Sequence, residues 1–193
     1  MNFKTLFDFE DALAKYTGAP YVVVTDCCTH AIELCLRYEQ VTRCSFSANT
    51  YVSIPQLMRQ LNIQYDLIDE LWLGEYHFHG TRIWDSARLL RPQMYRTGYM
   101  QCVSFGNGKP LQLGRAGAIL LDDVETYDEL SRMRSDGRDL HISPWQQQVN
   151  FKQGYHYCPT LETCQLGLEK LGSVDPEPKY HHYPTLGLLI FLD

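Results

Sequence analysis

The sequence predicts an α/β fold in which short buried strands alternate with helices. A β-branched run at residues 21–24 passes directly into a segment with helical character at 29–38. Further strand-length runs, separated by polar or helical stretches, follow at 44–46, 63–69, 81–84, 99–105 and 117–121. This alternation is typical of helices packed on a sheet.

Helices and a hairpin complete the expected elements. Residues 2–16 place large apolar side chains at mixed helical spacing, so a first helix should end near Gly18. A helix with a polar face is expected at 125–134. Residues 117–121 should return beside the strand at 99–105, because small residues there allow close backbone packing.

Composition limits the class of protein. The chain has 193 residues, 45% of them hydrophobic and 21% charged, which suits one globular domain with a real core. A net charge of -6 without a compensating basic run argues against a nucleic-acid surface. The longest apolar stretch, at 186–192, is too short to span a membrane, and the charged start lacks a signal core.

Cysteine and histidine patterns give little support for a metal site. The seven cysteines are an odd number without a C-x-x-C pair, which disfavours a disulfide framework and a zinc site. His77 and His79 alternate like strand residues, but no third ligand is near them in sequence. We therefore expect no bound metal, surface or partly buried histidines, and a reducing cytoplasm as the location.

The stretch CVSFGNGKPLQLGRAG at 102–117 joins an apolar run to a glycine-rich loop that holds Lys109. A lysine after a buried strand can form a Schiff base, because burial lowers the pKa of an ammonium group. Asp85 ends another apolar stretch. This pair suits pyridoxal phosphate, whose aldehyde needs a lysine and whose pyridine nitrogen needs a carboxylate that keeps it protonated. A solvated loop lysine is the alternative for Lys109.

These segments resemble the DegT/DnrJ/EryC1/StrS sugar aminotransferases, which are fold type I pyridoxal phosphate enzymes. SFGNGK at 104–109 has the spacing of the family's S-F-H-x-x-K, and LGRAGAILLDD at 113–123 is similar to the continuation of that motif. WDSAR at 84–88 is similar to E-D-A-A-Q. FEDALAKYTGAPYVVVTDC at 9–27 follows the family's opening segment.

The resemblance implies a three-layer α/β sandwich with a mostly parallel sheet, a reduced version of the fold type I large domain. That domain would occupy 1–172, and a short tail at 173–193 with one apolar strand would replace the family's small C-terminal domain. The strand at 63–69 would belong to the same sheet. The connector between Asp69 and Thr81 is shorter than in the family, which normally has another helix and strand there.

A strand that leads into a helix N-terminus creates an anion site, because free backbone N–H groups and the helix dipole converge there. Residues 27–29 stand in the place of the family's S-G-T. The resemblance therefore implies that the Cys28 and Thr29 amides and the Thr29 hydroxyl hold the cofactor phosphate, with Ser104 as a further donor. Cysteine departs from the family's glycine at this point. A plain helix cap is the alternative for Thr29.

Three more residues have implied roles. Tyr51 would stack on the pyridine ring, with a core or surface tyrosine as the alternative. Arg88 would bond the cofactor's phenolic oxygen or a substrate carboxylate, with a surface ion pair as the alternative. His156 replaces an asparagine that reaches the neighbouring subunit's phosphate in the family. This implies a homodimer with shared active sites, with a packed interface histidine as the alternative.

The resemblance implies an aminotransferase with Lys109 and Asp85 as its catalytic residues. An amino acid, usually glutamate, would donate the amino group to a keto acceptor such as a nucleotide-linked keto-sugar. Because the small domain normally closes the cleft, a non-catalytic remnant that acts as a binding or partner protein stays an alternative. Another is a different pyridoxal phosphate reaction, such as racemisation. Lys109 argues against the lysine-less sugar dehydratases of the family.

Overall fold

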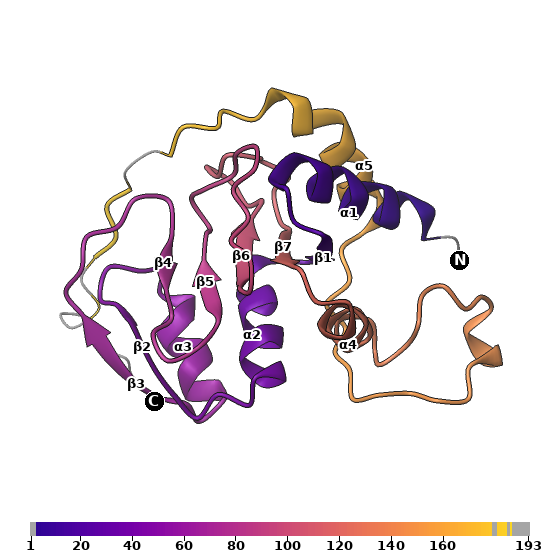
Figure 1. Cartoon of the computed structure of the whole chain (residues 1–193), viewed down its shortest axis with the longest axis horizontal. Coiled ribbons are helices and arrows are strands. Elements are labelled where there is room, and N and C mark those ends of the chain that lie inside the picture. Colours follow the sequence, from indigo (N-terminus) through magenta and orange to yellow (C-terminus); the bar gives the residue numbers. More distant parts are fainter. Residues whose placement is uncertain (1–2, 179–180, 185, 187–193) are drawn as a thin grey trace.

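The structure is a computed structural model that describes residues 3–178, 181–184 and 186. These residues form five α-helices, seven strands and two short 3-10 helices (Figure 1). In chain order the elements are α1 (Lys4–Thr17), β1 (Tyr21–Thr25), α2 (Cys28–Tyr38), β2 (Arg43–Ser47), α3 (Ser53–Gln60), β3 (Gln64–Ile68), β4 (Tyr76–His77), β5 (Ile83–Asp85), β6 (Met100–Ser104), β7 (Gly117–Leu121), α4 (Val124–Arg134), η1 (Trp145–Gln147), α5 (Leu161–Lys170) and η2 (Leu171–Ser173).

Five strands form the central sheet in the order β1-β7-β6-β5-β4. β5 and β6 are parallel, whereas β7 is antiparallel to both of its neighbours, β1 and β6, and β4 is antiparallel to β5. The predicted α/β class is confirmed, and the sheet is mixed rather than purely parallel. The expected pairing of 117–121 with the preceding strand is also confirmed.

β3 does not belong to the central sheet, so the prediction that residues 63–69 join it is wrong. β2 and β3 form a separate parallel pair. A single bridge joins Ser45 on β2 to His79, which lies two residues beyond the end of β4. The reason is the length of β4, which has two residues and cannot pair along the five residues of β2. The exposed and half-buried residues of β3 match this peripheral position.

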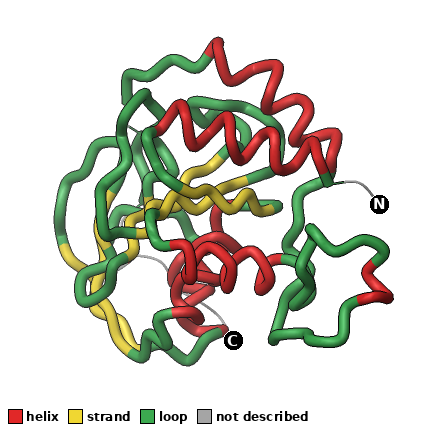
Figure 2. The backbone as a smooth tube through the Cα atoms, turned by 45° about the vertical axis from the view of Figure 1, so that its right-hand side comes forward, coloured by secondary structure: helices red, strands yellow, loops and turns green. Residues whose placement is uncertain are grey.

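Helices cover both faces of the central sheet, which gives the expected three layers (Figures 1 and 2). Side chains alternate along a strand, so β1 contributes to both faces. Val22 and Val24 pack in a core with α1 and α5, while Val23 packs in a second core with α2, α3 and α4. Strand residues buried on both faces explain the continuous apolar runs in the sequence.

The chain beyond α5 passes back toward β2 and β3 (Figure 1). There Leu186 is buried, and its N–H donates to the carbonyl oxygen of Ala48 at 2.8 Å. Tyr183 and Leu186 therefore anchor a segment whose other described residues are mostly exposed. The predicted boundary at residue 172 stays a prediction, and the predicted apolar strand lies, from residue 187 onward, outside the described residues.

Candidate active site

A cavity of about 330 Å³ opens at the edge of the central sheet where β1, β5 and β6 end. β1 and β6 run in the same direction because both are antiparallel to β7, and β5 is parallel to β6. Their carboxyl ends therefore place Cys27, Asp85 and Ser104 in one wall. The volume suits a small-molecule site. The predicted residues that line the cavity are Cys28, Thr29, Tyr51, Asp85, Arg88, Ser104 and Lys109.

Asp85 is buried and held at both carboxylate oxygens. Oδ1 accepts from the Ala87 amide and Oδ2 from the Tyr76 hydroxyl, each at 2.9 Å. The Tyr76 hydroxyl is in turn 2.7 Å from the Thr50 hydroxyl. Burial raises the pKa of Asp85, although the Ala87 amide, the Lys109 charge and the Tyr76 hydroxyl oppose that rise. The carboxylate is thus fixed in one orientation.

Lys109 lies on the loop between β6 and β7. The loop is closed by hydrogen bonds from Leu113 N to Phe105 O at 2.8 Å and from Lys109 N to Gly106 O at 3.3 Å. Gly108 has a φ of 70°, a left-handed conformation that glycine adopts without strain. The loop brings the ammonium group into the cavity, where it is close enough to act on the pKa of Asp85.

The amino end of α2 forms another wall of the cavity. Cys27 is the cap of this helix, since its sulfur accepts from the His30 amide at 3.5 Å. Thr29 is therefore not the cap, and its hydroxyl instead shares a hydrogen bond of 2.9 Å with Ser53. The amides of Cys28 and Thr29 belong to the first turn, where backbone N–H groups have no acceptor within the helix. This arrangement can bind an anion.

The structure explains how cysteine is accommodated where the family has glycine. The Cys28 side chain packs in the same core cluster as Cys35 and Cys102, and burial raises the pKa of its thiol well above the usual value. Gly117 on β7 lies directly against the helix start, because a Cβ there would be 2.5 Å from Cys28 N. The missing side chain at Gly117 allows the strand to approach the helix closely.

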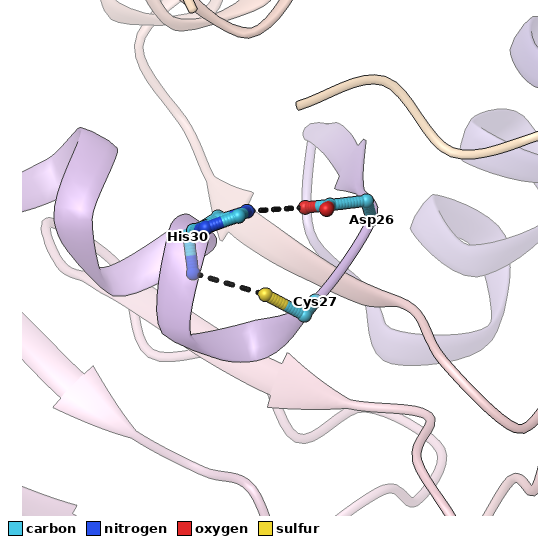
Figure 3. Close-up of side chains that lie close together, drawn as sticks. All are labelled: Asp26, Cys27 and His30. Atoms are coloured by element: carbon cyan, nitrogen blue, oxygen red, sulfur yellow. Dashed lines mark hydrogen bonds and ion pairs between the residues drawn. The ribbon is translucent and has the colours of Figure 1, made fainter. Parts of the chain in front are cut away.

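Asp26, Cys27 and His30 cluster beside this helix start (Figure 3), with potential ligand atoms within 4.8 Å of one another. His30 Nδ1 is 2.6 Å from Asp26 Oδ1, and Arg115 donates to Asp26 Oδ2 at 2.9 Å. Burial lowers the pKa of His30, but hydrogen bonds to Asp26 and Cys27 outweigh it and raise the pKa to about 10.

A metal ion at this cluster would have to displace the His30 proton and tolerate the neighbouring Arg115. The cluster therefore acts as an ion pair that anchors the loop before α2. The D-C-x-x-H spacing at residues 26–30, at a helix start, is the sequence pattern from which this cluster could have been found. Among the histidines predicted to be surface or partly buried, His77 is half-buried and stacks on Trp84.

Within the part of the chain that the structure describes, Arg88 forms hydrogen bonds and not the surface ion pair considered as its alternative. Its Nη1 donates to the Gly108 carbonyl at 2.8 Å and its Nε to the Tyr183 hydroxyl at 3.2 Å. Tyr51 lines the cavity with 58% of its surface exposed, so it is not a core tyrosine. Ser104 ends β6 next to Gly106, close to the lysine loop.

His156 is not among the residues that line this cavity. Its side chain is 88% exposed, and its ring is 3.1 Å from Asp136 Oδ1. The role across a subunit interface stays a prediction. Sequence reasoning gave no role to Cys27 and Arg115, although both lie in quoted motifs, and it missed four lining or supporting residues that no motif marks: Trp72, Tyr76, His181 and Tyr183.

The family model that describes the DegT/DnrJ/EryC1/StrS aminotransferase family matches residues 2–69 and 92–179. No curated protein matches the chain by sequence. None of the helices in the described residues is long and apolar enough to cross a membrane.

Solved structures with the same fold include AtS13 from Actinomadura melliaura, at 18% identity and a TM-score of 0.75 over 89% of this chain and 60% of that one. The sugar aminotransferase CalS13 from Micromonospora echinospora has 18% identity and a TM-score of 0.71, covering 87% of this chain and 60% of its own. Spr1654 from Streptococcus pneumoniae, solved in a PLP form, has 16% identity and a TM-score of 0.71 over 88% and 59%. This chain thus spans about 60% of their length.

Proposed function

Because the chain belongs to the DegT/DnrJ/EryC1/StrS aminotransferase family, we propose that it binds pyridoxal phosphate in this cavity and transfers an amino group from an amino acid to a keto acceptor. The observation that carries the proposal is the joint placement of Lys109, the anchored Asp85 and the amino end of α2 around one cavity. The solved PLP form of Spr1654 supports the choice of cofactor.

The donor set of the cavity fits this cofactor. Lys109 supplies an amine for the aldehyde, and Asp85 supplies a carboxylate of fixed orientation for the pyridine nitrogen. The Cys28 and Thr29 amides, the Thr29 hydroxyl and Ser104 supply donors for the phosphate.

When bound, pyridoxal phosphate supplies an electron sink for the bonds at the carbon that carries the amino group. Asp85 would hold a proton at the ring nitrogen, and its buried position keeps water from competing for that contact. Lys109 Nζ would take the proton from the substrate carbon and return it. Tyr51 would cover the ring, and Arg88 would orient an oxygen of the cofactor or a substrate carboxylate.

We further propose a nucleotide-linked keto-sugar as the acceptor and an amino acid such as glutamate as the donor. CalS13, a sugar aminotransferase of the same fold, supports this choice. Arg88, Arg115 and Lys109 in the cavity wall provide cationic groups that favour anionic ligands.

A homodimer with shared active sites, located in the cytoplasm, completes the proposal. Leu71 is 87% and Leu73 is 55% exposed, and they flank Trp72 in the cavity wall. Such exposed apolar side chains beside a site favour an interface. His156 would then face the partner's site.

An absorbance titration with pyridoxal phosphate tests the proposal. The wild-type chain should gain a visible band that fades when an amino donor is added. Reduction with borohydride followed by peptide mass spectrometry should find the cofactor on Lys109, and Lys109→Ala should lose both signals. A colourless protein, or cofactor attached at random lysines, would instead favour the non-catalytic remnant. A band that persists with donor and acceptor while an amino acid loses its chirality would favour racemisation.

A further inference from the structure

Tyr183 is buried although its neighbours in the chain are exposed. It is 8% exposed, whereas His181, His182 and Pro184 are all exposed. Its ring stacks on Trp72 with centroids 5.8 Å apart, and the Trp72 indole N–H donates to the Asn49 carbonyl at 2.7 Å. The tyrosine is therefore held in the cavity wall by a partner that is itself fixed.

The Tyr183 hydroxyl is the meeting point of two cationic side chains. It accepts from Arg88 Nε at 3.2 Å and from Lys109 Nζ at 3.4 Å. Arg88 also donates to the carbonyl of Gly108, the residue before the lysine. One hydroxyl thus restrains the lysine through its amine and, by way of Arg88, through its loop.

We propose that Tyr183 is the positioning residue that aims Lys109 Nζ into the cavity. A lysine side chain is a flexible four-carbon stem, so its amine needs a partner to stay in one place. A phenol supplies that partner as a neutral acceptor, without the added negative charge of a carboxylate. This inference rests on the proposed function only in taking Lys109 as the working amine.

Two reactions of Lys109 test the inference, and they respond in opposite directions. In the first, pyridoxal phosphate is mixed with the chain and trapped by borohydride, and the rate of trapping at Lys109 is followed against cofactor concentration. In the second, the cofactor-free chain is methylated with formaldehyde and a hydride reductant, and Lys109 is compared with the exposed Lys170 by mass spectrometry.

Tyr183→Phe keeps the ring on Trp72 and removes the acceptor. Since one hydrogen bond contributes about 1 kcal/mol, the saturating rate of trapping should fall about five-fold. The half-saturating cofactor concentration should stay unchanged, because the phosphate is held at α2. Methylation of the released amine should become faster. If the Tyr183 side chain only filled space, the substitution would change the trapping rate and the methylation rate in the same direction, or it would change neither rate.

Three variants complete the design. His182→Ala, on the same segment and exposed, should match the wild type in both reactions. Thr29→Val should raise the half-saturating concentration without changing the saturating rate. Tyr183→Ala, which also removes the ring on Trp72, should repeat the effects of Tyr183→Phe, and unchanged tryptophan fluorescence of Tyr183→Phe should show that its ring still stacks on Trp72.

The two proposals fail separately. A wild-type chain that never carries cofactor on Lys109 overturns the proposed function, and the methylation ratio of Tyr183→Phe to wild type still decides the inference. A wild-type chain that is trapped at Lys109, with Tyr183→Phe unchanged in both reactions, overturns the inference alone.

Discussion

The Tyr76 hydroxyl donates to Asp85 Oδ2 at 2.9 Å, and Asp85 lines the cavity. Tyr76 lies on β4 and Asp85 on β5, and the two residues are direct partners in the antiparallel register of these strands. The two-residue edge strand β4 therefore also positions a side chain of the site. It holds the buried carboxylate for which we propose the central electronic role.

Asp85→Asn should change the pH dependence of stability and abolish amino transfer. Burial raises the pKa of Asp85 above that of the unfolded chain, so folding takes up a proton there, and this group makes the wild type more stable as the pH falls toward the unfolded value near 4. An asparagine side chain cannot titrate, so the variant should lack this gain and lose amino transfer. Urea unfolding at a series of pH values from neutral to acidic measures the free energy of unfolding of both proteins. If the two free energies change in parallel with pH, the prediction is contradicted.

His30→Gln should lower stability in a defined pH range. The folded pKa of about 10 lies above the usual 6.5, so the stabilisation is complete below 6.5 and is lost as the pH rises through 10. We expect a loss of roughly 1.5–3 kcal/mol at neutral pH, the size of a hydrogen bond to a charged group. The pH-dependent part of the difference in unfolding free energy between wild type and variant should disappear above pH 10. A difference independent of pH would show that the ion pair to Asp26 does not cause it.

Gly117→Ala should displace the start of α2. The new Cβ would lie 2.5 Å from Cys28 N and 2.7 Å from Cys27 C, which are backbone atoms and cannot move aside cheaply. We expect a destabilisation of about 1–3 kcal/mol and weaker cofactor binding. Gly172→Ala is the matched control, because a Cβ there meets nothing within 4 Å. Equal thermal midpoints for the two variants would refute the close approach.

His156→Ala should leave the stability of the single chain unchanged, because this side chain is 88% exposed and its ring contacts an Asp136 that is itself partly exposed. If the histidine reaches a partner's phosphate, the variant should bind cofactor more weakly while sedimentation still shows a dimer. An unchanged cofactor affinity in a variant that still dimerises would show that His156 does not belong to the site. A protein that stays monomeric at all concentrations would contradict the proposal of shared active sites.

Part of the cavity wall could be predicted because those residues belong to short motifs at strand ends. Lys109, Ser104 and Asp85 follow apolar runs that the sequence displays, and strand direction then brings them together. Tyr76 and Tyr183 follow no such rule. Each acts through one hydroxyl on a residue elsewhere in the chain, and with 13 tyrosines in the sequence no local pattern separates these two from the others.

The amino-acid sequence alone determined the α/β class, the family and the residues around the lysine, because these depend on local periodicity and on motifs a few residues long. Tertiary structure alone decided that β3 leaves the central sheet, that Cys27 rather than Thr29 caps α2, and that Tyr183 reaches Lys109. The physical reason is that these features depend on which of several competing partners a residue meets. Strand length and packing across distant parts of the chain settle that choice.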